Sequence, residues 1–151
     1  MANKHIYIKV LDRKIISFIK KHHVLTLATA FNNKPYCCTC FYVYMEKENK
    51  FLITSDKDTR HIAEAMKQPC VSGAIALETT MVGKIQGIQF TGTITEVKEE
   101  DAAGMKKAYI RRFPVAAFSE LLMWCIEPDF IKFTDNRLGF GKKMIWQQEK
   151  K

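Results

Sequence analysis

The sequence lacks any long hydrophobic run. No apolar stretch approaches the roughly 18 residues that a membrane-spanning helix needs. The first residues, MANKHIYIKVLDRK, contain neither the apolar segment nor the small-residue cleavage site of a secretion signal. We therefore expect a cytoplasmic protein that has no membrane as a partner.

Linkers, repeats and low-complexity tracts are missing as well. The chain has only 7 glycines and 4 prolines among 151 residues, and they do not gather into a flexible segment. That length suits one domain, and a hydrophobic content of 47% is too high for a disordered chain. We expect a single domain over residues 1–151, with an N-terminal helix at about 11–22 and a barrel at about 24–147.

Cysteine occurs an odd number of times, which does not suit a framework of disulfides. In a reducing cytoplasm all five cysteines are expected to be thiols. Three of them, Cys37, Cys38 and Cys40, form the cluster CCTC, which lacks the C-x-x-C spacing of a zinc knuckle. Adjacent strand residues point to opposite faces, so Cys37 and Cys38 are poorly placed to share an ion. The sequence therefore predicts no metal site.

Positive charge is in excess, with 24 Lys and Arg against 16 Asp and Glu and a net charge of +8. A phosphorylated or polyanionic partner is one interpretation, and a solvated lysine surface is the other. The basic residues are scattered and are not interleaved with aromatic residues, as they are in a base-stacking platform. This pattern argues against a nucleic-acid partner.

Hydrophobic alternation and turn residues predict a chain made mainly of strands. In the turn FNNKP, Asn32 and Asn33 supply a tolerant backbone. Gly83, Gly87 and Gly92 mark bends or bulges in one long strand. Short strands around a bent one predict a small antiparallel barrel with peripheral helices, a mainly β fold of the α+β class. The predicted strands are residues 24–30, 36–45, 50–55, 70–77, 82–97, 124–128, 130–135 and 144–148.

Three helices are predicted from periodicity and capping. Asp12 caps the first. The second runs from about Thr59 to Gln68, with Asp58 as its cap. The third covers residues 99–113, acidic at its start and basic at its end, as the helix dipole prefers. The inward-facing residues of the second helix are expected to be Ile62, Ala65 and Met66.

Groups that bind anions gather where the third strand meets the second helix. Thr54 and Ser55 supply hydroxyls at the strand end, and Thr59 and Arg60 open the helix. The first N–H groups of a helix have no internal partner and the dipole there is positive, so this end accepts phosphate. A guanidinium makes paired hydrogen bonds to phosphate oxygens. The ordinary alternative is that Asp58 and Thr59 only cap the helix while Arg60 is solvated.

The order of these motifs resembles the pyridoxamine 5'-phosphate oxidase-like superfamily of FMN-binding split barrels. The resemblance covers about residues 22–134 and rests on the NNKP turn, the T-S-x-x-x-T-R-H helix start and a bent strand with FTG. Three blocks, GIQFTGTI, KKAYIRRFPVA and IKFTDNRLGFGKKMIW, are similar to a small bacterial branch of it. The resemblance implies an antiparallel six-stranded split β-barrel of the FMN-binding type. It also implies a homodimer with two FMN sites at the subunit interface.

The resemblance also implies where FMN binds. The oxidases hold the FMN phosphate with Ser-Arg-Lys where this chain has Thr59, Arg60 and His61. The strand around Thr39 falls where the ring and ribityl chain lie, and Gln89 is the candidate for a flavin-contacting glutamine. The cofactor-binding residues implied are Cys38, Thr39, Cys40, Thr54, Ser55, Thr59, Arg60, His61 and Gln89.

The substrate site is less defined. Tyr109 and Arg112, at the basic end of the third helix, and Lys142, in the GFGKK loop, are candidates for binding an unknown small anionic substrate. Core packing, dipole compensation and a plain turn are the alternatives for these residues. The oxidases carry an arginine and a lysine where this chain has Cys38 and Val43. We therefore expect no efficient oxidation of pyridoxamine phosphate.

The resemblance implies a flavin-dependent oxidoreductase of unknown substrate, in which the flavin does the redox chemistry. No catalytic residue is assigned. A thiolate–imidazole pair of Cys38 or Cys40 with His61 lacks the third group that would orient it. Two other functions stay open, namely a non-enzymatic flavin or haem carrier and a basic barrel that binds nucleic acid.

Overall fold

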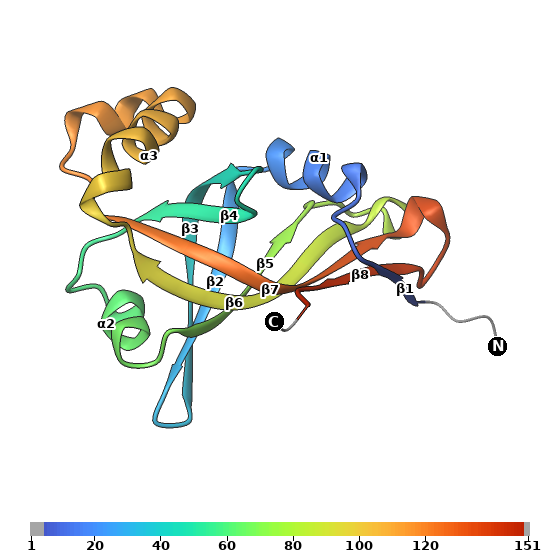
Figure 1. Cartoon of the computed structure of the whole chain (residues 1–151). Coiled ribbons are helices and arrows are strands. Elements are labelled where there is room, and N and C mark those ends of the chain that lie inside the picture. Colours follow the sequence, from blue (N-terminus) through green and yellow to red (C-terminus); the bar gives the residue numbers. More distant parts are fainter. Residues whose placement is uncertain (1–4, 150–151) are drawn as a thin grey trace.

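The computed structural model describes residues 5–149, which form eight strands and three α-helices joined by short 3-10 turns (Figure 1). The strands are β1 His5–Ile8, β2 Val24–Phe31, β3 Lys34–Met45, β4 Lys50–Thr54, β5 Cys70–Ala76, β6 Gln86–Glu96, β7 Met123–Asp135 and β8 Lys143–Gln147. The helices are α1 Arg13–Lys21, α2 Arg60–Lys67 and α3 Glu99–Arg112, and the 3-10 turns are η1 Val82–Lys84, η2 Pro114–Phe118 and η3 Asn136–Leu138. None of these helices is long and apolar enough to cross a membrane.

The strands form one sheet that closes into a barrel. Its order is β1-β8-β7-β4-β3-β2-β5-β6, and β6 also pairs with β7. Six strands, β7, β4, β3, β2, β5 and β6, therefore make a closed antiparallel ring, while β8 and β1 extend the sheet from β7. The mainly β, α+β barrel expected from the sequence is confirmed, but the part of the chain described has eight strands rather than six.

The strand β1 was not expected. It pairs in parallel with β8, from His5 opposite Lys143 to Ile8 opposite Trp146. Its side chains are mostly exposed, so His5–Ile8 carries no alternation of buried and exposed residues. Backbone pairing places it, with Ile8 alone packed against the core, and a hydrophobic pattern cannot reveal such a strand.

The ring closes at a bulge between β6 and β7. The register shifts between Thr91 and Gly92, where Thr91 lies opposite Phe130 and Gly92 opposite Pro128. A Cβ on Gly92 would lie 2.3 Å from the carbonyl oxygen of Glu127. The bulge expected at Gly92 is confirmed. The two strands predicted at 124–128 and 130–135 are one strand, β7, and the bulge lies between them.

The long strand predicted for residues 82–97 starts later than expected. Residues 82–84 form the 3-10 turn η1, so Gly83 lies outside the sheet. Gly87 lies in β6, where a Cβ would come 3.0 Å from the carbonyl oxygen of Ile75. Glycine thus permits a close strand approach at Gly87 and Gly92, and nothing lies within 4 Å of a Cβ built at Gly83.

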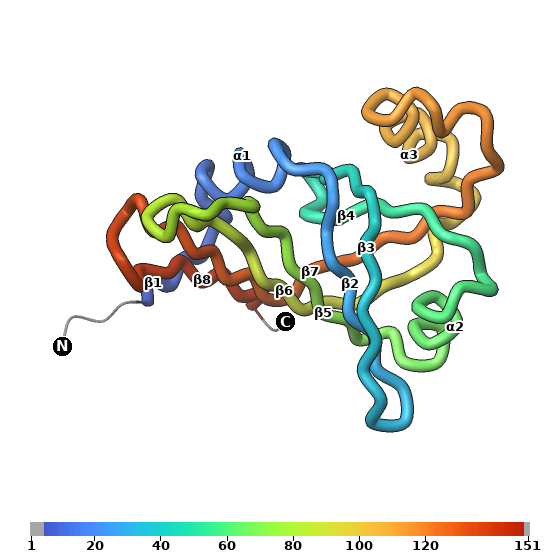
Figure 2. The backbone as a smooth tube through the Cα atoms, turned by 180° about the vertical axis from the view of Figure 1, so that it is seen from behind, coloured from blue at the N-terminus to red at the C-terminus, as the bar shows by residue number. Residues whose placement is uncertain are grey.

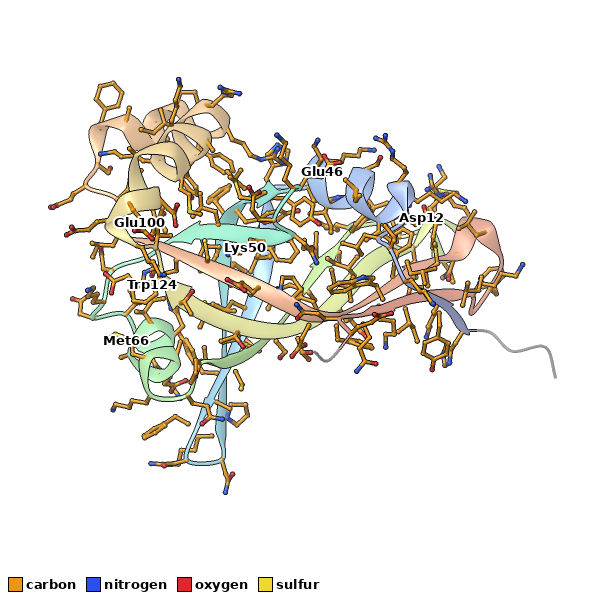
Figure 3. All side chains as sticks on the ribbon, in the orientation of Figure 1. Asp12, Glu46, Lys50, Met66, Glu100 and Trp124 are labelled. Atoms are coloured by element: carbon orange, nitrogen blue, oxygen red, sulfur yellow. The ribbon has the colours of Figure 1, made fainter. Side chains whose placement is uncertain are left out.

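The helices follow their expected positions with two corrections. Asp12 caps α1 by accepting a hydrogen bond from the Lys14 N–H at 2.7 Å. The N-cap of α2 is Thr59 rather than Asp58. Met66 is 59% exposed and lies on the outer side of α2 (Figure 3), whereas it was expected to face inward.

Two apolar clusters hold the elements together. The larger fills the barrel, where Phe51 and Phe90 stack with ring centroids 4.9 Å apart, and α1 contributes Ile15 and Ile19 to it. The smaller lies under α3 and includes Leu52 and Tyr109. The helix α3 is therefore packed on the outer face of the barrel.

The β2–β3 hairpin projects beyond the rest of the barrel, and α2 lies beside it (Figure 2). Its two-residue turn places Asn32 and Asn33 at φ of 50° and 58°. Both values lie in the left-handed region that such a hairpin turn requires, so the predicted turn is confirmed. The Thr29 hydroxyl donates to Glu64 of α2 at 2.6 Å and holds the helix to the hairpin.

The closure at Gly92 makes a prediction about stability. We expect Gly92→Ala to lower the free energy of unfolding by about 3 kcal/mol, because the new methyl group meets rigid backbone. Gly104→Ala is the matched control, since nothing lies within 4 Å of a Cβ there. Gly104 is an exposed position inside α3, where alanine should stabilise the helix by up to about 1 kcal/mol. Denaturant unfolding of both variants measures this, and an equal effect of the two substitutions would contradict the account.

Candidate functional site

A cavity of about 420 Å³ lies where the end of β4, the start of α2 and the end of α3 meet. We call it the α2 cavity. Its walls come from β3, β4, the loop before α2, α3, η2 and the segment that follows η2. It is lined by Phe41, Thr54, Ser55, Asp56, Thr59, Tyr109, Phe113, Val115, Ala116, Ser119, Glu120, Leu121 and Leu122.

One wall of the α2 cavity is polar and held in place from behind. The Ser55 carbonyl accepts a hydrogen bond from the indole Nε1 of Trp124 at 2.9 Å, and the Ser55 N–H donates to Leu122 at 3.1 Å. The Ser55 hydroxyl oxygen lies 3.1 Å from Thr59 Oγ1 and 2.8 Å from Nε2 of His61. These contacts fix Ser55 between β7 and α2.

The start of α2 has no side-chain cap. Thr59 is the N-cap, but its hydroxyl donates to the Asp56 carbonyl at 2.7 Å and accepts no cap hydrogen bond from a backbone N–H of the helix. The first N–H groups of a helix have no internal acceptor and carry the positive end of the dipole. An anion can therefore accept hydrogen bonds at this end of α2, beside the hydroxyls of Ser55 and Thr59.

The opposite wall is aromatic. The rings of Tyr109 and Phe113 lie 5.1 Å apart, and Phe41 meets Phe113 edge-on at 5.3 Å. Thr54 donates a long hydrogen bond of 3.4 Å to the Tyr109 hydroxyl, and burial raises the pKa of Tyr109. The cavity thus offers a polar end for an anion and flat apolar surfaces for a ring.

Two thiols and an imidazole gather behind the polar wall. The side-chain alternation of β3 puts Cys38 and Cys40 on one face and exposes Cys37 on the other. The sulfurs of Cys38 and Cys40 are 3.8 Å apart, and a ring nitrogen of His61 completes a group within 4.8 Å. We call this group the thiol–imidazole cluster.

The cluster does not hold an activated thiolate. Burial raises the pKa of Cys40 to about 12 and also raises that of Cys38. Burial lowers the pKa of His61. All three groups are therefore neutral near neutral pH, whereas a thiolate–imidazole nucleophile needs the opposite shifts.

The structure separates the cofactor-binding residues expected from the sequence into distinct places. Thr54, Ser55 and Thr59 line the α2 cavity, and Cys38, Cys40 and His61 form the cluster behind it. Thr39 lies exposed on the outer face of β3. Gln89 lines a separate groove over β2, β5 and β6. Arg60 donates to Glu64 Oε1 at 2.8 Å and stacks over Tyr36 with 4.3 Å to the ring centroid.

The three substrate candidates also separate. Tyr109 lines the α2 cavity. Arg112 donates to the carbonyls of Lys20 at 3.0 Å and His22 at 2.5 Å, so it binds the C-terminal end of α1. Lys142 lies in the loop between η3 and β8, at the opposite end of the molecule from α2 (Figure 1).

Sequence reasoning missed three residues of this site. Phe41 and Phe113 form the aromatic wall, and Trp124 positions Ser55. The alternation along β3 places Phe41 on the outward face, but a single exposed apolar residue is common and does not by itself indicate a site. The contact of Trp124 depends on the pairing of β7 with β4 and has no local signal.

The fold is that of a split barrel. A haem-binding protein from Mycobacterium smegmatis matches with a TM-score of 0.72 and 14% identity, over 86% of this chain and 55% of that protein. An FAD-binding protein from Mesorhizobium loti matches with a TM-score of 0.67 and 13% identity, over 81% and 90% of the two chains. The resemblance to split barrels in the sequence is confirmed at the level of the fold.

Sequence relatives give the family. A UPF0306 protein of Klebsiella pneumoniae is 37% identical over 132 residues, which are 87% of this chain and 90% of that protein. The UPF0306 protein YhbP of Escherichia coli O157:H7 is 39% identical over 132 residues, which again are 87% of this chain and 90% of that protein. The chain belongs to the UPF0306 family. No protein-family model matches it.

Because Cys40 is buried, we expect its thiol to react more slowly than an exposed one. We expect iodoacetamide at pH 8 to label exposed Cys70 at least about 100-fold faster than Cys40 in folded, chelator-treated protein. The reagent needs both access and a thiolate, and Cys40 is buried with a pKa of about 12. Peptide mass spectrometry over time follows both sites, and denatured protein is the control in which the rates should converge. Equal rates in the folded protein would contradict this environment for Cys40.

Proposed function

We propose that the protein binds FMN in the α2 cavity. The observation that carries this proposal is the α2 cavity itself, in which an uncapped helix start faces an aromatic wall. FMN has the matching chemistry, with a phosphate at one end and a flat ring at the other. The names of the haem-binding and FAD-binding split barrels support a planar cofactor on this fold.

The phosphate lies at the start of α2 in this proposal. The first-turn N–H groups and the Ser55 hydroxyl donate hydrogen bonds to its oxygens, and the Thr59 hydroxyl joins them by turning from the Asp56 carbonyl. These groups are neutral, whereas a phosphomonoester carries nearly two negative charges. Arg60 is the first residue of α2 and supplies the countercharge by turning from Glu64, its partner in this structure, toward the phosphate.

The ring lies against the aromatic wall. Phe41 and Phe113 exclude water from its surface, and the Tyr109 hydroxyl is held near it by Thr54. A bound flavin supplies hydride or electron transfer, so we propose an oxidoreductase of unknown small-molecule substrate. The chain's own residues hold the cofactor and set its surroundings. We place this chemistry in the cytoplasm, where the cysteines stay reduced.

Haem is the second candidate, favoured by the haem-binding protein from Mycobacterium smegmatis with the same fold. Haem iron is usually held by His, Cys, Met or Tyr. Among the described residues that line the α2 cavity there is no His, Cys or Met, and the Tyr109 hydroxyl already accepts from Thr54. This lining favours a flavin. The absorbance of the purified protein separates a flavin spectrum from the Soret band of haem.

The first functional prediction concerns the phosphate. We expect Arg60→Ala to weaken FMN binding by about ten- to a hundredfold, since one charge-assisted hydrogen bond contributes roughly 1.5–3 kcal/mol. Riboflavin, which lacks the phosphate, should bind the variant and the parent equally. Fluorescence titration of both flavins measures this.

Lys67→Ala is the matched control for Arg60→Ala. Lys67 is a cation on the last turn of the same helix and, like Arg60, lies over an aromatic ring, that of Phe31 at 4.9 Å. Its removal should leave FMN affinity unchanged. An FMN affinity that is unchanged by Arg60→Ala, or an equal loss of affinity for FMN and riboflavin, would contradict the phosphate site.

A homodimer is part of this proposal. Apolar side chains beside the α2 cavity are exposed in the single chain, with Val115 at 77% and Phe118 at 91%. Isolated apolar residues are common on surfaces, but a group at the rim of a cavity suits an interface. A second copy over η2 would cover these residues and complete the cofactor site.

We expect the protein to sediment as a dimer at micromolar concentration and Phe118→Asp to shift it toward monomer. A charge buried without a partner in an interface is strongly unfavourable. Phe140→Asp is the control, because Phe140 is 69% exposed and lies in the loop between η3 and β8 at the far end of the molecule. A parent protein that is monomeric with its cofactor bound would contradict this part of the proposal.

A further inference from the structure

The thiol–imidazole cluster has the composition and spacing of a metal site. Cys38 and Cys40 come from the inward face of β3, and His61 comes from the first turn of α2. Their ligand atoms lie within 4.8 Å of one another although they come from two elements of the fold. We propose that these three residues bind one zinc-type divalent ion. The sequence predicted no metal, because the adjacent residues Cys37 and Cys38 point to opposite faces of a strand and His61 is 21 residues beyond Cys40 in the chain.

The distance between the sulfurs, which is that of an S–H···S hydrogen bond between the two thiols, also suits a shared ion. In tetrahedral zinc sites the metal–sulfur bond is about 2.3 Å, which places two sulfurs about 3.8 Å apart. The sulfurs of Cys38 and Cys40 are 3.8 Å apart in this structure. The two thiols therefore present the separation of two zinc ligands before any ion is added.

A disulfide between the same residues fits less well. The sulfurs would have to approach from 3.8 Å to about 2.05 Å. Residues two apart on an extended strand have Cα atoms about 6.6 Å apart, near the upper limit for a disulfide. β3 pairs with β2 along this stretch, with Cys38 opposite Leu27 and Cys40 opposite Leu25, so the strand is held extended. Metal binding needs no movement of that strand.

His61 is oriented as a metal ligand usually is. Its Nε2 lies 2.8 Å from the Ser55 hydroxyl, and the Trp124 indole in turn holds the Ser55 carbonyl. Histidines that bind metals commonly have their other ring nitrogen engaged by such a partner. The nitrogen that does not contact Ser55 is the one left for the ion.

Charge and protons balance in the site. Binding one divalent ion to two thiols and a neutral imidazole breaks two S–H bonds, forms two metal–sulfur bonds and one metal–nitrogen bond, and releases two protons to solvent. The ion and the two thiolates together carry no net charge, which suits a position where Cys40 is buried.

Three protein ligands leave a fourth position open, as in catalytic zinc sites of the Cys₂His kind. Ser55 and Thr59 line the α2 cavity, and both lie within 3.5 Å of His61 Nε2. The imidazole of His61 therefore lies between the proposed ion and the polar wall where we place the phosphate. The metal site goes beyond the proposed flavin site and does not depend on it.

Cobalt titration tests the metal site directly. The full chain is reduced, treated with a chelator, freed of flavin and titrated with Co²⁺. We expect one ion per chain, with a thiolate-to-cobalt charge-transfer band and the strong d–d bands of a tetrahedral site. Cys40→Ser and Cys38→Ser should each weaken binding by about a hundredfold or more. Cys37→Ser, which changes an exposed thiol beside the cluster, should bind as the parent does.

Several outcomes would overturn the metal site. They are the absence of these bands in the folded parent protein, or equal cobalt affinity of the Cys37→Ser and Cys38→Ser variants. Circular dichroism checks that each variant folds. If Cys40→Ser does not fold, the cobalt affinity of Cys38→Ser, which changes a half-buried residue, tests the site. Flavin titration is run separately on metal-free and cobalt-loaded protein. A protein that shows the cobalt bands but does not bind FMN would contradict the flavin site alone. A protein that binds FMN but shows no cobalt bands would contradict the metal site alone.

Discussion

The pairing of β6 with β7 closes the barrel and thereby positions the strands that carry the site. It turns an eight-stranded sheet into a closed six-stranded ring with two added strands. The pairing needs a glycine at position 92, where the backbone of Glu127 comes too close for a side chain. β7 also pairs with β4, and the register of that pairing places Trp124 opposite Ile53. The indole of Trp124 then holds Ser55 at the rim of the α2 cavity.

Ser55 links the two parts of the site. Ser55 contacts both Thr59 and His61, so one hydroxyl connects the start of α2 with the thiol–imidazole cluster. The proposed flavin and the proposed ion therefore lie on the two sides of one polar wall. The cavity side offers neutral donors, a dipole and aromatic rings, which suit a phosphorylated ring compound. The inner side offers soft ligands in a buried place, which suit a transition metal.

The sequence predicted correctly those features that depend on a few neighbouring residues. The Asn32-Asn33 turn, the Asp12 cap and the bulge at Gly92 each rest on a property of a few neighbouring residues, and each is present. The strand β1 could not be predicted, because it has no buried face. For the site, the sequence indicated the hydroxyls before α2, but the cluster needs α2 docked against β3. The period of two along β3 does place Cys38 and Cys40 together, and His61 joins them only through the tertiary fold.

The central claim is that the α2 cavity holds a flavin with its phosphate at the start of α2. A crystal structure of the protein grown with FMN tests it most directly. We expect phosphate oxygens within hydrogen-bond distance of the first-turn N–H groups of α2 and of the Ser55 and Thr59 hydroxyls, with the ring against Phe41 and Phe113. A flavin bound instead in the groove of Gln89 over β2, β5 and β6, or a cavity that stays empty at saturating FMN, would contradict it.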